Sequence, residues 1–186
     1  MKETESFSMP SAGDVLVAGP LLLDPNFARS LVFLHEVGLE GAMGFILNRP
    51  LGKTLGDIVN EPGLPKFLKP LPLYFGGPVQ ADQFMLVLFL RESDDHRLRC
   101  EINPAASQIR EALDSGTGWL RAYIGYSGWT SGQLQVECQQ EDWQRTPSDE
   151  IMVNHDQSQG LWELYHRGDH RWQAFRGHFP KTWGKN

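Results

Sequence analysis

The chain has 186 residues, 40% of them hydrophobic, and a formal net charge of −6. Its length predicts one domain with a sizeable core. The acidic balance argues against non-specific wrapping on nucleic acid, although a local basic patch is still allowed. The N-terminus lacks a basic stretch followed by an apolar run, so no signal peptide is expected. The longest apolar run, residues 84–90, is too short to span a bilayer. We therefore expect a soluble, cytoplasmic protein with no membrane partner.

The first half of the chain predicts mostly strands. Residues 1–13 form an expected flexible leader. Thr54 can cap the N-terminus of a short helix, and four prolines between residues 60 and 72 predict an irregular loop. Strands are expected at 14–18, 30–37, 42–47 and 73–75, and the second and third of these should form a hairpin.

The second half adds helices. Asn103-Pro104 should begin a helix that ends near Gly116, and Ser131 can cap another. Strands are expected at 84–90, 98–102, 119–126 and 151–153, a short strand or turn beginning at Trp143, and a helix fragment at 161–165. The pattern predicts a single α+β domain: a mixed, largely antiparallel and partly barrel-like sheet flanked by three or four helices.

Residues 125–134 are the most informative stretch, reading Gly-Tyr-Ser-Gly-Trp-Thr-Ser-Gly-Gln-Leu. Glycine supplies a positive φ or a close backbone approach. The stretch predicts a strand-to-helix turn whose N–H groups could cradle a phosphate or carboxylate. The alternative is that its glycines serve close packing. It matches neither a P-loop, because no Lys-Ser/Thr follows the glycines, nor a dinucleotide fingerprint.

Four blocks of sequence resemble the YqgE/AlgH family in order and spacing. They are Leu-Val-Ala-Gly-Pro-Leu-Leu-Leu-Asp-Pro-Asn-Phe (16–27), Gly-Ala-Met-Gly-Phe-Ile-Leu-Asn-Arg-Pro (41–50), Phe-Gly-Gly-Pro-Val (75–79) and the 125–134 stretch. The resemblance covers residues 14–165. The chain departs from the family pattern at Ser127, where Ala is usual, and at Thr130-Ser131.

The resemblance implies a small bacterial-type α+β domain with a compact, partly barrel-like sheet. It also implies a link to transcriptional control of exopolysaccharide synthesis, with no established catalytic residue to carry over. Residues 166–186 are interpreted as a basic, aromatic C-terminal extension that many family members lack.

Candidate chemistry centres on Arg49. Its guanidinium could bind a carboxylate or phosphate in a bidentate fashion, or it could pair with Asp24, Asp57 or Glu137. Ser127 is a poor nucleophile candidate, because the fifth position of the motif is Trp129 and not Gly; no catalytic residue is assigned. The hypothesis is a ligand-binding cleft lined by Asn48, Arg49, Gly76, Gly77, Trp129, Gly132 and Gln133.

Metal and cofactor sites are not predicted. The cysteines, Cys100 and Cys138, lack zinc-ligand spacing and are expected to be free thiols. His155-Asp156 and the histidines at 166, 170 and 178 form no recognisable ligand pattern. The extension carries Trp172, Phe175, Phe179 and Trp183 among basic residues. Such a segment could bind single-stranded nucleic acid, or it could dock its aromatic side chains on the domain; docking is favoured.

Two functional hypotheses follow. The first is a non-enzymatic regulatory or partner-binding protein, in which the core does not bind DNA directly because it is acidic and shows no helix-turn-helix pattern. The second is a small-molecule or anion-binding protein, or an unrecognised enzyme, that uses the cleft near Arg49 and the 125–134 motif.

Overall fold

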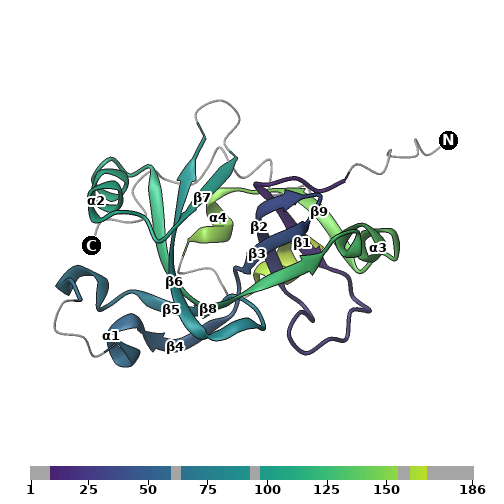
Figure 1. Cartoon of the computed structure of the whole chain (residues 1–186), viewed down its shortest axis with the longest axis horizontal. Coiled ribbons are helices and arrows are strands. Elements are labelled where there is room, and N and C mark those ends of the chain that lie inside the picture. The colour runs from purple at the N-terminus through teal and green to yellow at the C-terminus, as the bar shows by residue number, and fades with distance from the viewer. Residues whose placement is uncertain (1–8, 60–63, 93–96, 155–159, 167–186) are drawn as a thin grey trace.

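The computed structural model describes residues 9–59, 64–92, 97–154 and 160–166. Within these ranges the chain forms one α+β domain with nine strands and five short α-helices (Figure 1). The strands are β1 (Asp14–Ala18), β2 (Leu31–Gly38), β3 (Gly41–Ile46), β4 (Pro50–Thr54), β5 (Pro72–Phe75), β6 (Val79–Arg91), β7 (Leu98–Ile102), β8 (Gly118–Thr130) and β9 (Trp143–Pro147). The helices are α1 (Leu55–Ile58), α2 (Ala106–Asp114), α3 (Gln133–Gln139), α4 (Glu150–Val153) and α5 (Leu161–His166), with a 3₁₀ turn, η1, at Lys66–Leu68.

The strands form one mixed, mostly antiparallel sheet that is not closed. Its main path runs β4-β5-β8-β3-β2-β1-β9, and β6 joins β7 to β8 off this path. The one parallel pair among the described strands is β5 with β8. In Figure 1, β1, β2, β3 and β9 gather at one end and β4 to β7 toward the other, with β8 running between them. β8 is therefore the strand that both halves share.

The segment 76–78 crosses over β8. β5 and β6 both pair with residues 122–124 of β8, so they occupy its two opposite edges. The chain passes from one edge to the other in only three residues. The Gly76 N–H donates to the Ile124 carbonyl (2.8 Å), and the Gly76 carbonyl accepts from the Ile46 N–H (3.1 Å) and the buried Ser127 hydroxyl (2.9 Å). The crossing thus ties β5, β3 and β8 together.

Glycine is required where the two backbones meet. A Cβ at Gly76 would lie 2.2 Å from the Gly125 carbonyl oxygen, and one at Gly77 would lie 2.4 Å from the Tyr126 carbonyl. Gly125 also has a φ of 65°, which side-chain-bearing residues rarely adopt. Gly76 and Gly77 of the 75–79 block and Gly125 of the 125–134 motif therefore serve one close backbone contact.

The largest core cluster lies inside the curled sheet. Its centre is aromatic, with Phe33 edge-on to Phe89 (5.1 Å between ring centroids) and Phe45 against Tyr123 (5.0 Å). The helices α4 and α5 cover the cluster with three buried side chains: Met152, Val153 and Leu161.

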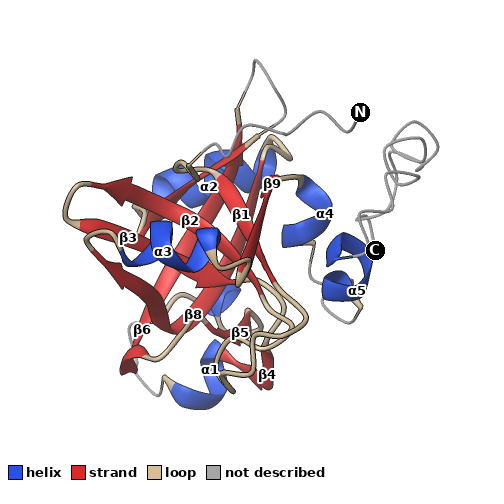
Figure 2. Cartoon of the chain, turned by 90° about the vertical axis from the view of Figure 1, so that its right-hand side faces the viewer, coloured by secondary structure: helices blue, strands red, loops and turns tan. Residues whose placement is uncertain are grey.

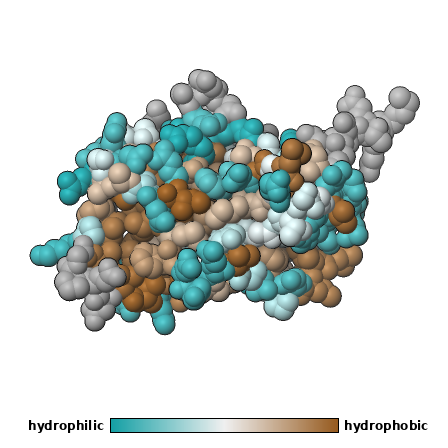
Figure 3. Space-filling view, in the orientation of Figure 1, coloured by the Kyte–Doolittle hydropathy of each residue, from teal (hydrophilic) through white to brown (hydrophobic). Residues whose placement is uncertain are grey.

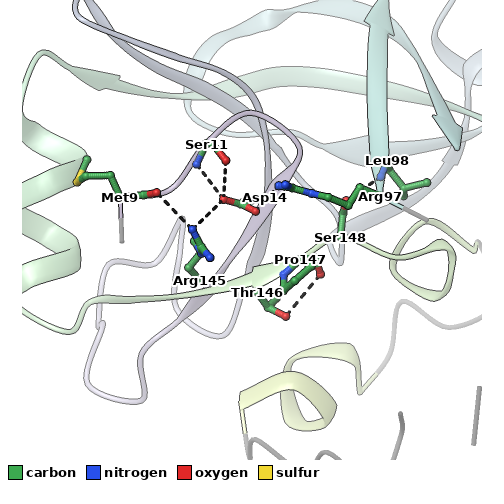
Figure 4. Close-up of polar contacts among 9 residues, drawn as sticks. All are labelled: Met9, Ser11, Asp14, Arg97, Leu98, Arg145, Thr146, Pro147 and Ser148. Carbon is green, nitrogen blue, oxygen red and sulfur yellow. Dashed lines mark hydrogen bonds and ion pairs between the residues drawn. The ribbon is translucent and has the colours of Figure 1, made fainter. Parts of the chain in front are cut away.

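A buried carboxylate joins three strands at the start of β1 (Figure 4). Asp14 accepts from the Ser11 N–H (2.8 Å) and hydroxyl (3.0 Å), and from the Arg97 guanidinium at 2.5 Å. Arg145 of β9 lies 3.8 Å from the same carboxylate. The ion pairs bring the residue before β7 and the edge strand β9 to β1.

The structure corrects several predicted elements. The strand expected at 119–126 continues to Thr130, so most of the glycine motif is strand and only residues 131–132 turn. Residues 151–153 form helix α4 and not a strand, because the Asp149 side chain accepts from the N–H groups of Ile151 and Met152 and caps a helix start. The strand β4 was missed, and helix α3 begins after Gly132 and not after Ser131. Five helices are described, against three or four predicted.

We expect Gly76→Ala to destabilise the protein by about 1–3 kcal/mol or more, because its methyl group would push two backbones apart. Gly38→Ala is the matched control, since no atom lies within 4 Å of its Cβ position and its φ is not positive. The control should change stability by less than about 0.5 kcal/mol. Urea denaturation followed by circular dichroism measures both; equal, small effects would contradict the crossing constraint.

Candidate functional site

Asn48 follows β3 and holds the start of β2. Its amide oxygen accepts from the Leu31 N–H (3.0 Å), and its amide nitrogen donates to the Arg29 carbonyl (3.0 Å). Arg29 has a φ of 58°, so the chain turns sharply just before β2. The Asn48 side chain thus hydrogen-bonds the main chain on both sides of Ser30 and holds this turn.

Arg49 binds the loop that precedes β2 at Pro25 and Ala28. One guanidinium nitrogen donates to the Pro25 carbonyl (3.0 Å) and the other to the Ala28 carbonyl (2.7 Å). The ion pairs of the described residues do not include Arg49. Its structural partners are therefore two main-chain carbonyls, and not the acids considered from sequence, which were Asp24, Asp57 and Glu137.

The loop held by Arg49 places Phe27 against two tryptophans. The Phe27 ring stacks on Trp129 (6.2 Å between centroids) and meets Trp143 edge-on (5.7 Å). The two indoles are themselves edge-to-face at 5.9 Å. Such aromatic pairs add about 0.5–1.5 kcal/mol each beyond the area that they bury.

Glu137 of α3 gathers the polar groups around these rings. One carboxylate oxygen accepts from both indole N–H groups, of Trp129 and Trp143, at 2.8 Å each. The other accepts from the Gln133 amide (2.8 Å), and the Gln133 oxygen accepts from the Thr130 N–H (3.0 Å). We call Phe27, Trp129, Gln133, Glu137 and Trp143 the indole–carboxylate cluster.

The seven predicted site residues thus lie in several neighbouring parts of the fold. Asn48 and Arg49 hold the 25–31 loop, and that loop reaches the indole–carboxylate cluster through Phe27. Trp129 and Gln133 belong to the cluster, while Gly132 caps α3 with a φ of 74°. Gly76 and Gly77 lie at the β8 crossing.

Sequence reasoning missed three members of the cluster, Phe27, Glu137 and Trp143. One signal was present: Glu137 stands four residues after Gln133, the spacing at which helical side chains meet.

Three side chains that could act as nucleophiles, Ser127, Cys100 and Cys138, are buried. The Ser127 hydroxyl donates to the Gly76 carbonyl and is fully buried. Both cysteines are free and buried, as predicted for their thiol state. Burial raises the pKa of Cys100 to about 12 and that of Cys138 to about 11. Cys100 lies 3.2 Å from the His35 ring nitrogen Nδ1.

Arg121 is a fully buried cation in the centre of the domain. Its guanidinium donates to the carbonyls of Leu47 (2.7 Å) and Met152 (3.3 Å), and it lies over the Tyr74 ring at 4.3 Å. Because Met152 lies near the end of α4, the charge also meets the negative end of that helix. Arg121 therefore joins α4 to the end of β3 from inside the sheet.

Two searches of the described residues give negative findings. No group of three or more His, Cys, Asp or Glu side chains in those ranges could hold a metal ion. No helix in them is long and apolar enough to cross a membrane. His155-Asp156, the leader up to residue 8 and residues 167–186 lie outside the described ranges.

The end of the molecule around α3 exposes large apolar side chains. Leu21 (86% exposed) and Leu23 (84%) lie on the loop after β1, and Leu39 (92%) lies at the β2–β3 turn. Val136 of α3 is half exposed. We call these four residues the α3 face.

The segments that carry the α3 face adjoin helix α3 on two sides. Gly19 donates to the Asp142 carbonyl (2.7 Å) just after α3. A Cβ at Gly41 would lie 2.1 Å from the Trp129 carbonyl oxygen, just before α3. Figure 2 looks onto this end, with α3 in front and α5 to its right.

The same segments are acidic. Residues 19–24, 38–41 and 131–142 contain no Lys or Arg, and they contain Asp24, Glu40, Glu137, Glu141 and Asp142. Apolar side chains on the face shown in Figure 3 also gather over the other end of the molecule, where exposed Leu51, Ile58 and Phe67 lie on β4, α1 and η1.

We expect Arg49→Ala to lower the free energy of unfolding by about 1–3 kcal/mol, because two hydrogen bonds from a charged donor are lost. Near-ultraviolet circular dichroism should change as well, since Phe27 loses its support against Trp129. Arg99→Ala is the control: its ion pair with Glu101 is exposed and worth about 0–1 kcal/mol. An unchanged stability for Arg49→Ala would contradict the structural role.

The thiols should stay protonated and unreactive at pH 8. Their pKa values of about 12 and 11 exceed the ordinary thiol value of 9.0, so iodoacetamide should label Cys100 and Cys138 only after denaturation. Above pH 9 the unfolded thiols ionise while the folded ones remain protonated, so the free energy of unfolding should fall as pH rises toward 11–12. Mass spectrometry of labelled protein and urea titrations at several pH values measure the two effects. Rapid labelling of the native protein would contradict them.

The amino-acid sequence of this chain is similar to those of several known bacterial proteins. A UPF0301 protein of Stutzerimonas stutzeri is 38% identical over 143 residues, which cover 72% of this chain and 75% of the relative. The UPF0301 protein AlgH of Pseudomonas aeruginosa is 36% identical over 147 residues, 74% of this chain and 77% of the relative.

Solved structures agree with the fold. The solution structure of AlgH from Pseudomonas aeruginosa matches with a TM-score of 0.62 and 27% identity, and the match covers 94% of this chain and 98% of that one. A crystal structure of a Corynebacterium diphtheriae protein matches with a TM-score of 0.66 at 23% identity, covering 87% and 89%. The model of the family described as AlgH-like (DUF179) matches residues 15–168. This chain therefore belongs to the AlgH-like family.

Proposed function

We propose that this chain is a cytoplasmic, non-enzymatic regulatory protein that binds a protein partner through the α3 face. The observation that carries the proposal is the exposure of Leu21, Leu23 and Leu39 in the segments around one helix. Single exposed leucines are ordinary, but several at one end of a small domain are typical of an interaction surface.

The charges around the α3 face define the partner. Asp24, Glu40 and Glu141 are exposed on segments that contain no Lys or Arg. A surface of this sign attracts basic groups and repels phosphates. The partner is therefore a protein that presents apolar and basic side chains, and a link to transcriptional control would run through that protein and not through direct contact with DNA.

The site chemistry supports binding over catalysis. A nucleophile must be accessible and activated by a lowered pKa or a nearby base. The buried thiols have raised pKa values, about 12 for Cys100 and about 11 for Cys138, and the Ser127 hydroxyl is used by the β8 crossing. Anion binding at Asn48, Arg49, Gly76, Gly77, Trp129, Gly132 and Gln133 remains a prediction, and Arg49 would first have to release two carbonyls.

The test is quantitative capture of partners from a bacterial lysate with immobilised wild-type protein, Leu39→Asp and Leu51→Asp. Leu39→Asp adds a carboxylate to the α3 face, whereas Leu51→Asp makes the same change on β4. A specific partner should bind the wild type and Leu51→Asp but lose at least about tenfold in affinity, or about 1.4 kcal/mol, for Leu39→Asp when measured again with both proteins purified.

Two results would contradict the proposal. The first is a partner that binds all three proteins equally. The second comes from a thermal-shift screen against nucleotides, phosphorylated metabolites and organic acids: a ligand at a hundred times its Kd adds about 2.7 kcal/mol of stability. Such a shift, present in the wild type and absent in Arg49→Lys, would favour the anion-binding function instead.

A further inference from the structure

We propose that residues 167–186 of this chain dock on the Leu21–Leu23 part of the α3 face and so compete with the partner. The inference rests on the proposed function, because it names what regulates access to the same surface. It is carried by three observations: where the described chain ends, what the remaining residues are, and which surface lies next to that end.

The described chain ends beside the α3 face. The last described residue is His166 of α5, whose ring stacks on Trp162 at 4.3 Å. The Trp162 indole donates to the Ala18 carbonyl (2.7 Å), and Arg29 covers the same indole at 4.9 Å. Ala18 and Arg29 stand at the two ends of the loop that carries Leu21 and Leu23.

The distance to be covered is short. Ala18 stands three residues before Leu21, and three residues span at most about 11 Å. The 20 residues after His166 could extend over about 66 Å. The segment of residues 167–186 is therefore long enough to reach Leu21 and Leu23. Most of its residues would still be available to contact the acidic surface beyond these leucines.

The chemistry of the segment matches that surface. Residues 167–186 contain five Lys or Arg against one Asp, and four large aromatic side chains: Trp172, Phe175, Phe179 and Trp183. The loop and the turn after α3 offer exposed leucines together with Asp24, Glu141 and Asp142. Aromatic groups bury apolar area well, and opposite charges hold the orientation. The segment thus has the apolar and basic character that the partner requires.

The contact can be measured in the full-length chain by NMR. A nitroxide is attached to Lys181→Cys, which is practical because burial raises the pKa values of both native thiols, so they should not react. Paramagnetic broadening of the amide signals of residues 19–24 is expected. Signals of β4 residues 50–54 should broaden much less.

A matched pair of variants tests the surface. Leu21→Asp/Leu23→Asp should restore the amide signals of residues 19–24, whereas Leu51→Asp should leave the broadening unchanged. Both variants change exposed leucines, and far-ultraviolet circular dichroism checks that each folds. No broadening in the wild type, or equal broadening in both variants, would overturn the proposal.

A mixing experiment separates this chain's own segment from a second copy. Isotope-labelled protein without nitroxide is mixed with unlabelled protein that carries it. Contact within one molecule predicts no broadening in the mixture; full broadening would mean that a second copy occupies the face, which would overturn the proposal.

The proposal and the function on which it rests can fail separately. Replacing Trp172 and Phe175 by Ala should tighten binding of the partner, by about tenfold if the segment covers the face in nine of ten free molecules. A partner that depends on Leu39 but binds this variant no more tightly would leave the proposed function standing and remove the competition. Broadening at residues 19–24 together with no partner that depends on Leu39 would support docking of residues 167–186 and would contradict the proposed function.

Discussion

The fold depends on the place where the chain crosses over β8, the strand that both halves of the sheet share. β5 and β6 lie on opposite edges of β8, and only Gly76, Gly77 and Pro78 join them. At this point backbone packs on backbone, with room for no Cβ at Gly76, Gly77 or Gly125. Because β3 pairs with β8 from residue 127 onward, the crossing also fixes where the second half of the sheet begins. One contact between backbones therefore joins the two halves around a common core.

The same crossing determines where function can be sought. Since Gly125 lies at the crossing and the buried Ser127 hydroxyl is bound to the Gly76 carbonyl, the first part of the glycine motif belongs to strand β8 and is not an open loop. The motif reaches the surface only at its end, where β8 gives way to α3. There the indole–carboxylate cluster fixes the helix, and Arg49 fixes the loop that brings Phe27 into that cluster. The proposed recognition surface is thus helix α3 flanked by two turns, and those turns carry the exposed Leu21, Leu23 and Leu39.

Local signals predicted much of the fold. The apolar run at 31–34, the alternation at 98–102 and the capping Thr54 each depend on neighbours in sequence, and β2, β7 and α1 appear where expected. The glycine motif could not be resolved in this way, because a glycine required by a turn and one required by a distant backbone look alike in a single sequence. Arg49 is a similar case: its partners are carbonyls, which no residue type reveals. Glu137 was missed because its two indole donors, Trp129 and Trp143, meet only in the folded chain.

The α3 face and residues 167–186 differ in the sign of their charge. The chain carries −6 overall, and residues 167–186 contribute +4, which leaves −10 on the residues before them. A strongly acidic domain that ends in a basic segment attracts that segment at any accessible acidic surface, but charge alone is screened within about 8–10 Å at physiological salt. In the proposed docking, apolar contact makes one position preferred, and Leu21 and Leu23 are exposed on the loop that begins after Ala18, whose carbonyl accepts from the Trp162 indole. In the proposed competition, a partner must therefore offer more apolar contact than residues 167–186 do, or engage Leu39 and Val136 as well.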